Sequence, residues 1–283
     1  MTILVTGARG NIARALVRKL LEAGHDVRAA GRDPGRARLP TGVEVVAADL
    51  ARPESWDAAL AGVTKAFLYA GTAGLDGFLS RASGLAQVVV LSALGADPAS
   101  ADAITRAHGE AEQAVRDSGL PWTFLRPGGF AANRLVWADS VRAGVVRDPF
   151  PESHSALIHE ADIAAVAVRA LTSSGHLGAA YSLTGPESLT VRQQASVLGE
   201  VTGRPVRVET QDLDDYRREL TATFEARGLG RVGSAEVVEA RIRRLAALVD
   251  RPQATTETAL AVTGRPARGF AEWAADHAGD FTR

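Results

Sequence analysis

The chain begins Met1-Thr-Ile-Leu-Val-Thr-Gly7-Ala-Arg9-Gly10-Asn11-Ile12-Ala13-Arg14, and this stretch decides the fold. The apolar run Ile3-Leu4-Val5 is typical of a buried parallel strand, and a helical pattern follows the glycine turn. Gly7 suits the tight turn, Gly10 lets the backbone approach a pyrophosphate, and Ala13 lets the helix pack closely. The pyrophosphate binds at the free N–H groups of the helix N-terminus. We therefore predict a dinucleotide-binding turn, with an ordinary strand-to-helix turn as the alternative, and expect cofactor contacts from Gly7, Arg9, Gly10, Asn11 and Ile12.

The composition excludes several classes of function. Among 283 residues, 46% are hydrophobic and 23% charged, as in ordinary globular proteins. The formal net charge of −1 argues against nucleic acid or an anionic membrane as a partner. Because the chain has no cysteine, disulfides, thiol nucleophiles and thiolate metal sites are excluded. No apolar run approaches the ~20 residues of a membrane span, and no signal-peptide pattern precedes the first strand. We therefore expect a cytoplasmic protein.

Short apolar runs alternate with helical patterns through the first half of the chain. This alternation predicts an α/β fold, a Rossmann-type doubly wound parallel sheet with helices on both faces. Strands are expected at 3–6, 27–30, 43–47, 66–69, 87–92 and 122–125, and helices at 11–23, 53–60 and 102–118. We assign residues 1–130 to a nucleotide-binding core.

The second half has longer loops and predicts a smaller C-terminal substrate-binding lobe. A helix at 163–171 with Asp162 as its N-cap and a strand at 180–183 are expected to return to the sheet. Thr190 is the expected N-cap of a helix at 191–202, and further helices are predicted at 213–227, 234–249 and 270–281, with a short strand at 206–209. We assign 160–184 to the core, and 131–159 and 185–283 to the lobe. This lobe is expected at the carboxyl edge of the sheet, where such sheets bind ligands.

The second strand ends at Gly31-Arg32-Asp33, and this end bears on the choice of nucleotide. An NAD-selecting unit places a carboxylate there to bind the ribose 2′-hydroxyl, whereas a guanidinium matches a 2′-phosphate. Arg9 points to the same neighbourhood, and Arg36 is a further candidate. The charges favour NADP(H) over NAD(H), but Asp33 at the ribose position would reverse the preference.

Two further turns are candidates for the adenosine half of the nucleotide. Asp49-Leu50 follows the third strand, where an acidic side chain binds the adenine amino group or caps a loop. Ala70-Gly71 follows the fourth strand, where a glycine allows backbone to lie against the ribose or simply makes a turn.

Several longer motifs carry a resemblance over almost the whole chain. They are Thr6-Gly-Ala-Arg-Gly-Asn-Ile-Ala13, Leu91-Ser92, His108-Gly-Glu-Ala-Glu112, Ser118-Gly-Leu-Pro-Trp-Thr-Phe-Leu-Arg-Pro127, Asn133, His159-Glu-Ala-Asp-Ile-Ala164 and Leu183-Thr-Gly-Pro-Glu-Ser-Leu-Thr190. With them the chain resembles the NmrA-like branch of the atypical short-chain dehydrogenases/reductases. The resemblance implies a quinone oxidoreductase dependent on NAD(P)H, a redox-sensing regulator that binds the nucleotide without turnover, or a tailoring enzyme of aromatic polyketides.

The acid catalyst of ordinary short-chain dehydrogenases is missing. They protonate a carbonyl with a tyrosine whose pKa is lowered by a lysine four residues later. None of the three tyrosines of this chain has a lysine four residues later, where Ala73, Gly185 and Leu220 stand instead. By the resemblance to the family, Ile104 takes the position of the catalytic tyrosine and His108 that of the lysine. A ketone needs a proton as the hydride arrives, whereas a reduced quinone is a phenolate-like anion that water can protonate. The missing pair therefore favours quinone reduction or a sensor over alcohol dehydrogenation.

The resemblance also implies roles for individual residues. His108 and Ser92 are the candidate catalytic residues, and Glu112 is expected in a structural ion pair with an arginine. Pro127 is expected near the nicotinamide, and the candidate substrate contacts are Phe130, Asn133, Trp137 and His159. The alternative for Phe130 and Trp137 is core packing. We expect no metal site, because no third ligand accompanies His154 and His159.

We therefore predict an oxidoreductase dependent on NAD(P)H that transfers hydride to a quinone or a related aromatic, polyketide-type molecule. The redox-sensing regulator and the polyketide tailoring or coupling enzyme remain the alternatives. A homodimer is compatible with the sequence. Arg241 and Arg244, one helical turn apart, are expected on a solvated helix face, with Glu239 facing Arg243.

Overall fold

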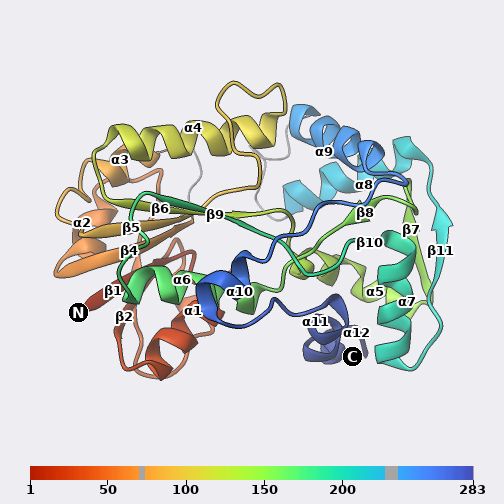
Figure 1. Ribbon diagram of the computed structural model, residues 1–283, viewed down its shortest axis with the longest axis horizontal. Helices are drawn as coiled ribbons and strands as arrows, with labels where there is room; N and C mark the ends of the chain where they lie inside the picture. The colour runs from red at the N-terminus through yellow and green to blue at the C-terminus, as the bar shows by residue number, and fades with distance from the viewer. Residues whose placement is uncertain (70–73, 227–234, 283) are drawn as a thin grey trace.

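The computed structural model describes residues 1–69, 74–226 and 235–282. Its centre is a seven-stranded sheet in the order β3-β2-β1-β4-β5-β6-β9, in which every pair is parallel (Figure 1). The strands are β1 Thr2–Thr6, β2 Asp26–Gly31, β3 Glu44–Ala47, β4 Val63–Tyr69, β5 Gln87–Leu91, β6 Trp122–Pro127 and β9 Ala179–Leu183. This order reverses between β1 and β4, and it confirms the predicted doubly wound fold.

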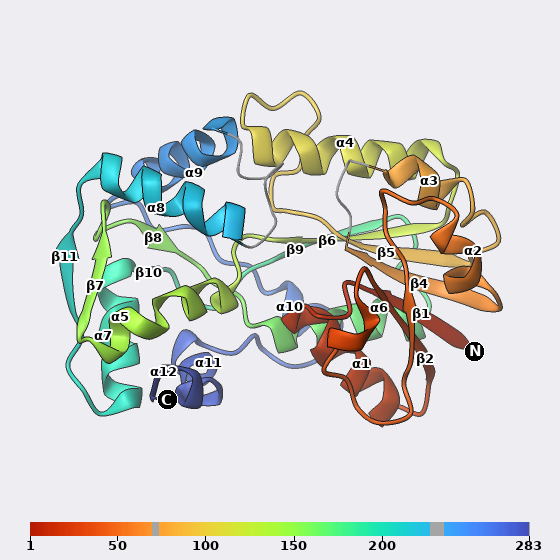
Figure 2. The same ribbon diagram turned by 180° about the vertical axis from the view of Figure 1, so that it is seen from behind.

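Helices cover both faces of the sheet because successive strand residues point to opposite sides. Ile3 and Val5 pack with α1 (Asn11–Glu22) and α6 (Glu160–Thr172), whereas Leu4 packs on the other face. The helices of that second face are α2 (Ser55–Leu60), α3 (Leu75–Leu79) and α4 (Ala103–Asp117), and Figure 2 shows the two layers from behind. Since both faces are buried, the strands read as continuous apolar runs in the sequence.

The remaining elements form the C-terminal lobe beside the carboxyl edge of the sheet (Figure 1). They are η2 Ala131–Trp137, α5 Ala138–Arg142, β7 Val145–Asp148, β8 His154–Ser155, β10 Leu189–Thr190, α7 Val191–Thr202, β11 Arg207–Thr210, α8 Leu213–Ala226, α9 Ala235–Ala247, α11 Phe270–Asp276 and α12 Ala278–Thr282. A third apolar core fills the lobe around Trp273. No helix in the described ranges has the length and apolarity needed to cross a bilayer.

The lobe differs from the predicted boundaries at one element. Residues 185–283 were all expected in the lobe, but α10 (Thr258–Thr263) packs on α6 and β9 of the core. Val262 of this helix lies against the same apolar cluster as α1. The reason is that part of the α6 and β9 surface is apolar and is covered by the returning chain.

The N-cap predicted for α7 is confirmed, whereas the N-cap predicted for α6 is wrong. Thr190 caps α7 in a capping box with Gln193, as predicted for its N-cap. The expected cap of α6 was Asp162, but His159 caps it by accepting the Ala161 N–H at 3.1 Å. Asp162 instead accepts the Arg268 backbone N–H at 2.7 Å, a contact between distant segments.

The expected helix at 270–281 is two helices in the structure. It ends at Asp276 and restarts at Ala278. His277, between them, hydrogen-bonds Glu160 of α6 at 2.7 Å and Asp280 at 2.9 Å. These side-chain contacts fix the break.

A buried carboxylate joins the sheet to α4. Glu112 is 1% exposed and accepts hydrogen bonds from the Ser92 hydroxyl at 2.6 Å, Arg126 Nε at 2.8 Å and Arg116 Nη2 at 3.0 Å. The predicted ion pair of Glu112 with an arginine is therefore present. Because two guanidinium groups and a hydroxyl surround it, the buried charge is compensated.

Replacing Glu112 with glutamine is expected to destabilise the protein by about 3 kcal/mol, because the arginines lose their buried counter-charge. The matched control is Glu110→Gln on the same helix, where Glu110 is exposed and lies 4.0 Å from Arg106. That change is expected to cost less than about 0.5 kcal/mol. Urea unfolding measures both, and equal losses would contradict the role of Glu112.

Candidate active site

The glycine loop after β1 has the geometry of a phosphate cradle. Gly7 adopts φ +74°, a left-handed conformation that favours glycine, and accepts the Gly10 N–H at 2.7 Å. The Ala8 N–H donates to the Ala30 carbonyl at 3.1 Å and ties the loop to β2. Gly10 is the N-cap of α1, and no side chain caps this helix. The N–H groups of the first turn, including those of Asn11 and Ile12, thus lack a side-chain cap, which fits a pyrophosphate.

An arginine-lined recess lies beside this loop. Arg9, Arg36 and Arg38 line it, together with Gly35 and Ala37. Arg36 also pairs with Asp33 at 3.1 Å. The Asp33 carboxylate, which would disfavour a 2′-phosphate, is therefore neutralised by a guanidinium group.

Arg32 lies exposed directly after β2 and is not among the lining residues of the recess. Arg38 does line the recess, although the sequence reasoning did not select it. The signal that could have found Arg38 is the arginine-rich spacing from residue 32 to residue 38.

The two candidate adenosine turns are only partly described. The Asp49 carboxylate accepts the Ala51 N–H at 3.0 Å, so the loop-cap alternative is present in the structure. Leu50 is half-buried, and its carbonyl lies against Gly74, where an added Cβ would approach to 2.0 Å. Ala70 and Gly71 lie outside the described residues.

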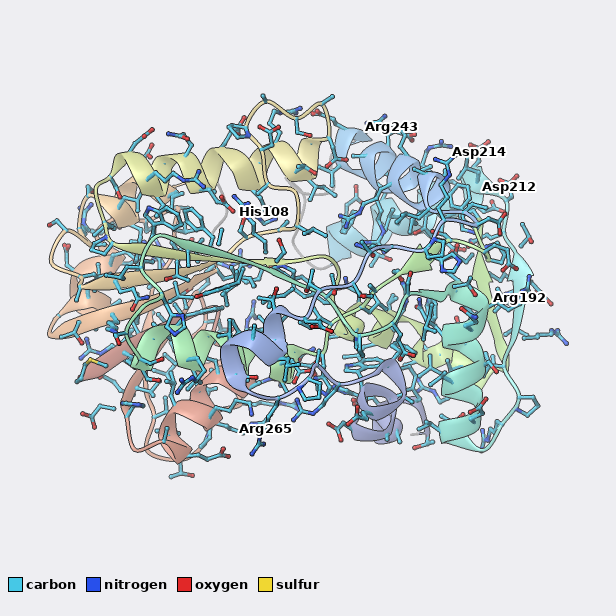
Figure 3. The ribbon with its side chains drawn as sticks, in the orientation of Figure 1. His108, Arg192, Asp212, Asp214, Arg243 and Arg265 are labelled. Atoms are coloured by element: carbon cyan, nitrogen blue, oxygen red, sulfur yellow. The ribbon has the colours of Figure 1, made fainter. Side chains whose placement is uncertain are left out.

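His108 and Ser92 have different surroundings. Figure 3 shows His108 on the side of α4 that faces the sheet, one helical turn before Glu112. Burial lowers the pKa of His108, with the Glu112 charge opposing, so the imidazole is neutral near physiological pH. Ser92 is 3% exposed and donates its hydroxyl proton to Glu112. Ser92 therefore takes part in the hydrogen-bond network of Glu112, and its expected catalytic role stays a prediction.

The turn after β6 begins the substrate side of the site. Pro127 is buried at the end of the strand, and its carbonyl accepts the Leu94 N–H at 2.9 Å. Phe130 is half-buried and bridges to Ile158, and Asn133 is exposed on η2. These residues place a partly apolar wall beside the carboxyl end of β6.

Two of the expected substrate contacts, Trp137 and His159, have partners within the protein. Trp137 belongs to the core of the lobe, and the Arg134 guanidinium lies over its ring at 4.4 Å from the centroid. His159 is 4% exposed, caps α6, and places its Nε2 3.2 Å from Asp276. Both side chains have contacts within the protein, and their expected substrate contacts stay predictions.

The face of α9 that was expected to be solvated points partly inward. Arg244 is half-buried and donates to the Gly128 carbonyl at 2.7 Å, in the turn after β6. The Nε atom of Arg241 is buried, with no hydrogen-bond partner among the described residues. Glu239 pairs with Arg217 of α8 at 2.5 Å, and the charge of Arg243 also helps to lower its pKa. The sequence alone did not select Arg241 and Arg244 as site residues.

Comparison with known proteins identifies the family. Residues 7–174 match the NAD(P)H-binding family. The chain is 41% identical to a (4-alkanoyl-5-oxo-2,5-dihydrofuran-3-yl)methyl phosphate reductase of Streptomyces griseus, over 99% of each chain. It is 37% identical to an NAD(P)H azoreductase of Xenophilus azovorans, again over 99% of each. A solved NADPH complex of an Escherichia coli quinone oxidoreductase superposes with TM-score 0.75 at 23% identity, covering 97% of this chain and 99% of that one.

The chain therefore belongs to the NAD(P)H-binding family. Its fold and relatives confirm the predicted class, an oxidoreductase dependent on NAD(P)H within the NmrA-like atypical short-chain dehydrogenases/reductases. The glycine loop, the uncapped end of α1 and the arginine recess fit such a nucleotide.

Replacing Gly7 with alanine is expected to weaken NADPH binding at least about 10-fold, because a methyl group and a strained turn would disturb the phosphate cradle. The matched control is Gly24→Ala, since Gly24 has φ +78° with no atom near the added Cβ. Both changes are expected to cost about 1–2 kcal/mol of stability. Fluorescence titration with NADPH and urea unfolding separate the two effects. Unchanged affinity in Gly7→Ala would contradict the cradle.

Proposed function

We propose that this protein uses NADPH to reduce electron-poor conjugated acceptors: quinones, and in particular the activated C=C bond of an acylated, phosphorylated five-ring lactone. The observation that carries the proposal is a glycine-loop phosphate cradle in a chain without the Tyr-x-x-x-Lys pair. The 41% identity to a reductase of such a lactone phosphate supports the choice of acceptor.

The chemistry of these acceptors suits a site without a strong acid. Bound NADPH supplies one hydride, which carries two electrons. In a lactone whose C=C bond is conjugated to two carbonyls, hydride adds to the β-carbon and the displaced electron pair is delocalised as an enolate. One proton then completes the C–C single bond. A quinone likewise becomes a hydroquinone by gaining one hydride and one proton. Orienting the acceptor supplies much of the rate in both cases.

His108 is the proposed catalytic residue, and it takes the position of the missing lysine. Its neutral imidazole on the sheet-facing side of α4 relays a proton between solvent and the product anion. Phe130 and Asn133 are the proposed substrate contacts, because they follow the turn that ends β6. Pro127 and the glycine loop are proposed for the cofactor, with Asp49 and Leu50 toward the adenine.

Reduction of an acceptor panel tests the proposal. NADPH consumption is measured with menadione, an azo dye, an acylated lactone methyl phosphate and cyclohexanone. We expect turnover of the conjugated acceptors and none of the simple ketone. Tight binding of NADPH and NADP⁺ without turnover of any conjugated acceptor would overturn the enzyme in favour of a nucleotide sensor.

We further propose that NADPH is preferred over NADH because Arg9, Arg32 and Arg38 surround the ribose 2′-phosphate. Arg32→Ala and Arg38→Ala are each expected to lower NADPH affinity about 10-fold, as loss of a charge-assisted hydrogen bond does. The NADH affinity of the same variants is the internal control and is expected to stay unchanged. Equal losses for both nucleotides, or no loss, would contradict the assignment.

A further inference from the structure

We propose that Arg241 and Arg244 of α9, backed by Arg134 of η2, form an anion site that holds the phosphate group of the substrate beside the place of hydride transfer. The inference rests on the proposed function and deepens it, because it selects organic phosphates among the conjugated acceptors.

Arg244 fixes the position of the site in the fold. Its hydrogen bond to the Gly128 carbonyl anchors the guanidinium at the carboxyl end of β6. Leu94, two residues after Ser92, also lies against Gly128, where an added Cβ would be 3.4 Å from its Cδ2 atom. Figures 1 and 2 show α9 beside the end of α4 where the chain enters that helix, and Arg106 of α4 pairs with Glu236 of α9 at 2.6 Å. The site therefore adjoins α4, which carries His108.

The arginines of this cluster lack counter-charges in contact. None of Arg134, Arg241 and Arg244 forms an ion pair within 4.0 Å among the described residues. Arg217, on the neighbouring helix α8, does form one, with Glu239 of α9. A buried guanidinium N–H group without a hydrogen-bond partner, such as Nε of Arg241, lowers the stability of the folded protein unless a ligand accepts its hydrogen bond.

Arg241 lies close enough to Arg134 and to Arg244 for its positive charge to act on both guanidinium groups. Burial lowers the pKa of Arg134 to about 10, with Asp148 opposing and Arg241 adding to the fall. Burial also lowers the pKa of Arg244, with Asp102 opposing and Arg241 adding to the fall. Like charges gathered in a partly buried place destabilise the unliganded protein, and an anion would relieve that repulsion.

The neighbouring acids do not fill the site. Asp148 is buried and accepts the Phe150 N–H at 2.8 Å, and burial raises its pKa. Asp102 caps α4 by accepting the Thr105 N–H at 2.8 Å. The three arginines outnumber the two aspartates, whose carboxylates already accept backbone N–H groups, so positive charge remains at the site. Guanidinium forks match the paired oxygens of a phosphate, so a phosphate monoester fits this site.

Binding of phenyl phosphate to the NADP⁺-saturated protein tests the site without turnover. Saturation fills the cofactor's own phosphate positions, and calorimetry measures the affinity. Arg241→Met is expected to weaken binding about 10- to 100-fold, and Arg241→Lys less. The matched control is Arg243→Met, since Arg243 is exposed on the outer side of α9 and is expected to leave binding unchanged (Figure 3). No binding to the wild type, or equal binding to Arg241→Met, would overturn the proposal.

Stability and substrate preference supply independent readouts. Because Arg241 lies among like charges, Arg241→Met is expected to leave Tm unchanged or higher, whereas a structural arginine would lower it. In turnover, Arg241→Met is expected to lose about 10- to 100-fold in kcat/KM for the lactone phosphate. It should keep its kcat/KM for menadione and for the dephosphorylated lactone. An equal loss on all acceptors would overturn the phosphate site and leave the reductase activity intact, whereas an inactive wild type would refute the proposed function instead.

Discussion

The buried carboxylate of Glu112 is the interaction on which the site geometry depends. It receives hydrogen bonds from Ser92 at the end of β5, from Arg126 in β6 and from Arg116 in its own helix. One charge thus fixes two strand ends relative to α4, the helix that carries His108. Ser92 thereby belongs to the hydrogen-bond network of Glu112. The chemistry proposed for the site is orientation and proton relay, which suits acceptors that form stabilised anions.

Two groups of arginines carry positive charge near the proposed site. Arg9 and Arg38 lie beside the glycine loop, where the nucleotide phosphates are proposed to bind. Arg241 and Arg244 belong to α9, and Arg244 contacts the turn after β6; neither forms an ion pair within 4.0 Å among the described residues. The formal net charge of the chain is nevertheless −1, so these groups are local features that overall composition conceals. Two separate cationic sites suit a reaction between two phosphorylated molecules.

The sequence predicted those parts of the protein that depend on local signals. The glycine loop and the Thr190 cap are decided by residues within a few positions of one another, and both were found. The cap of α6 was missed because two neighbouring residues could fill it, and a distant contact with Arg268 engages Asp162. The inward side of α9 was missed because a helix rich in arginine reads as solvated, and only packing against α4 decides which arginines turn inward.

Transfer of deuterium from the cofactor to the β-carbon of the lactone tests whether the protein catalyses hydride transfer. NADPH with two deuterons at nicotinamide C4 is mixed in single turnover with an acylated lactone phosphate, and the product is examined by mass spectrometry and NMR. We expect one deuteron on the β-carbon of the saturated lactone for each NADP⁺ formed. Recovery of unreacted, fully labelled NADPH bound to the protein, with no deuterium in the lactone, would contradict it.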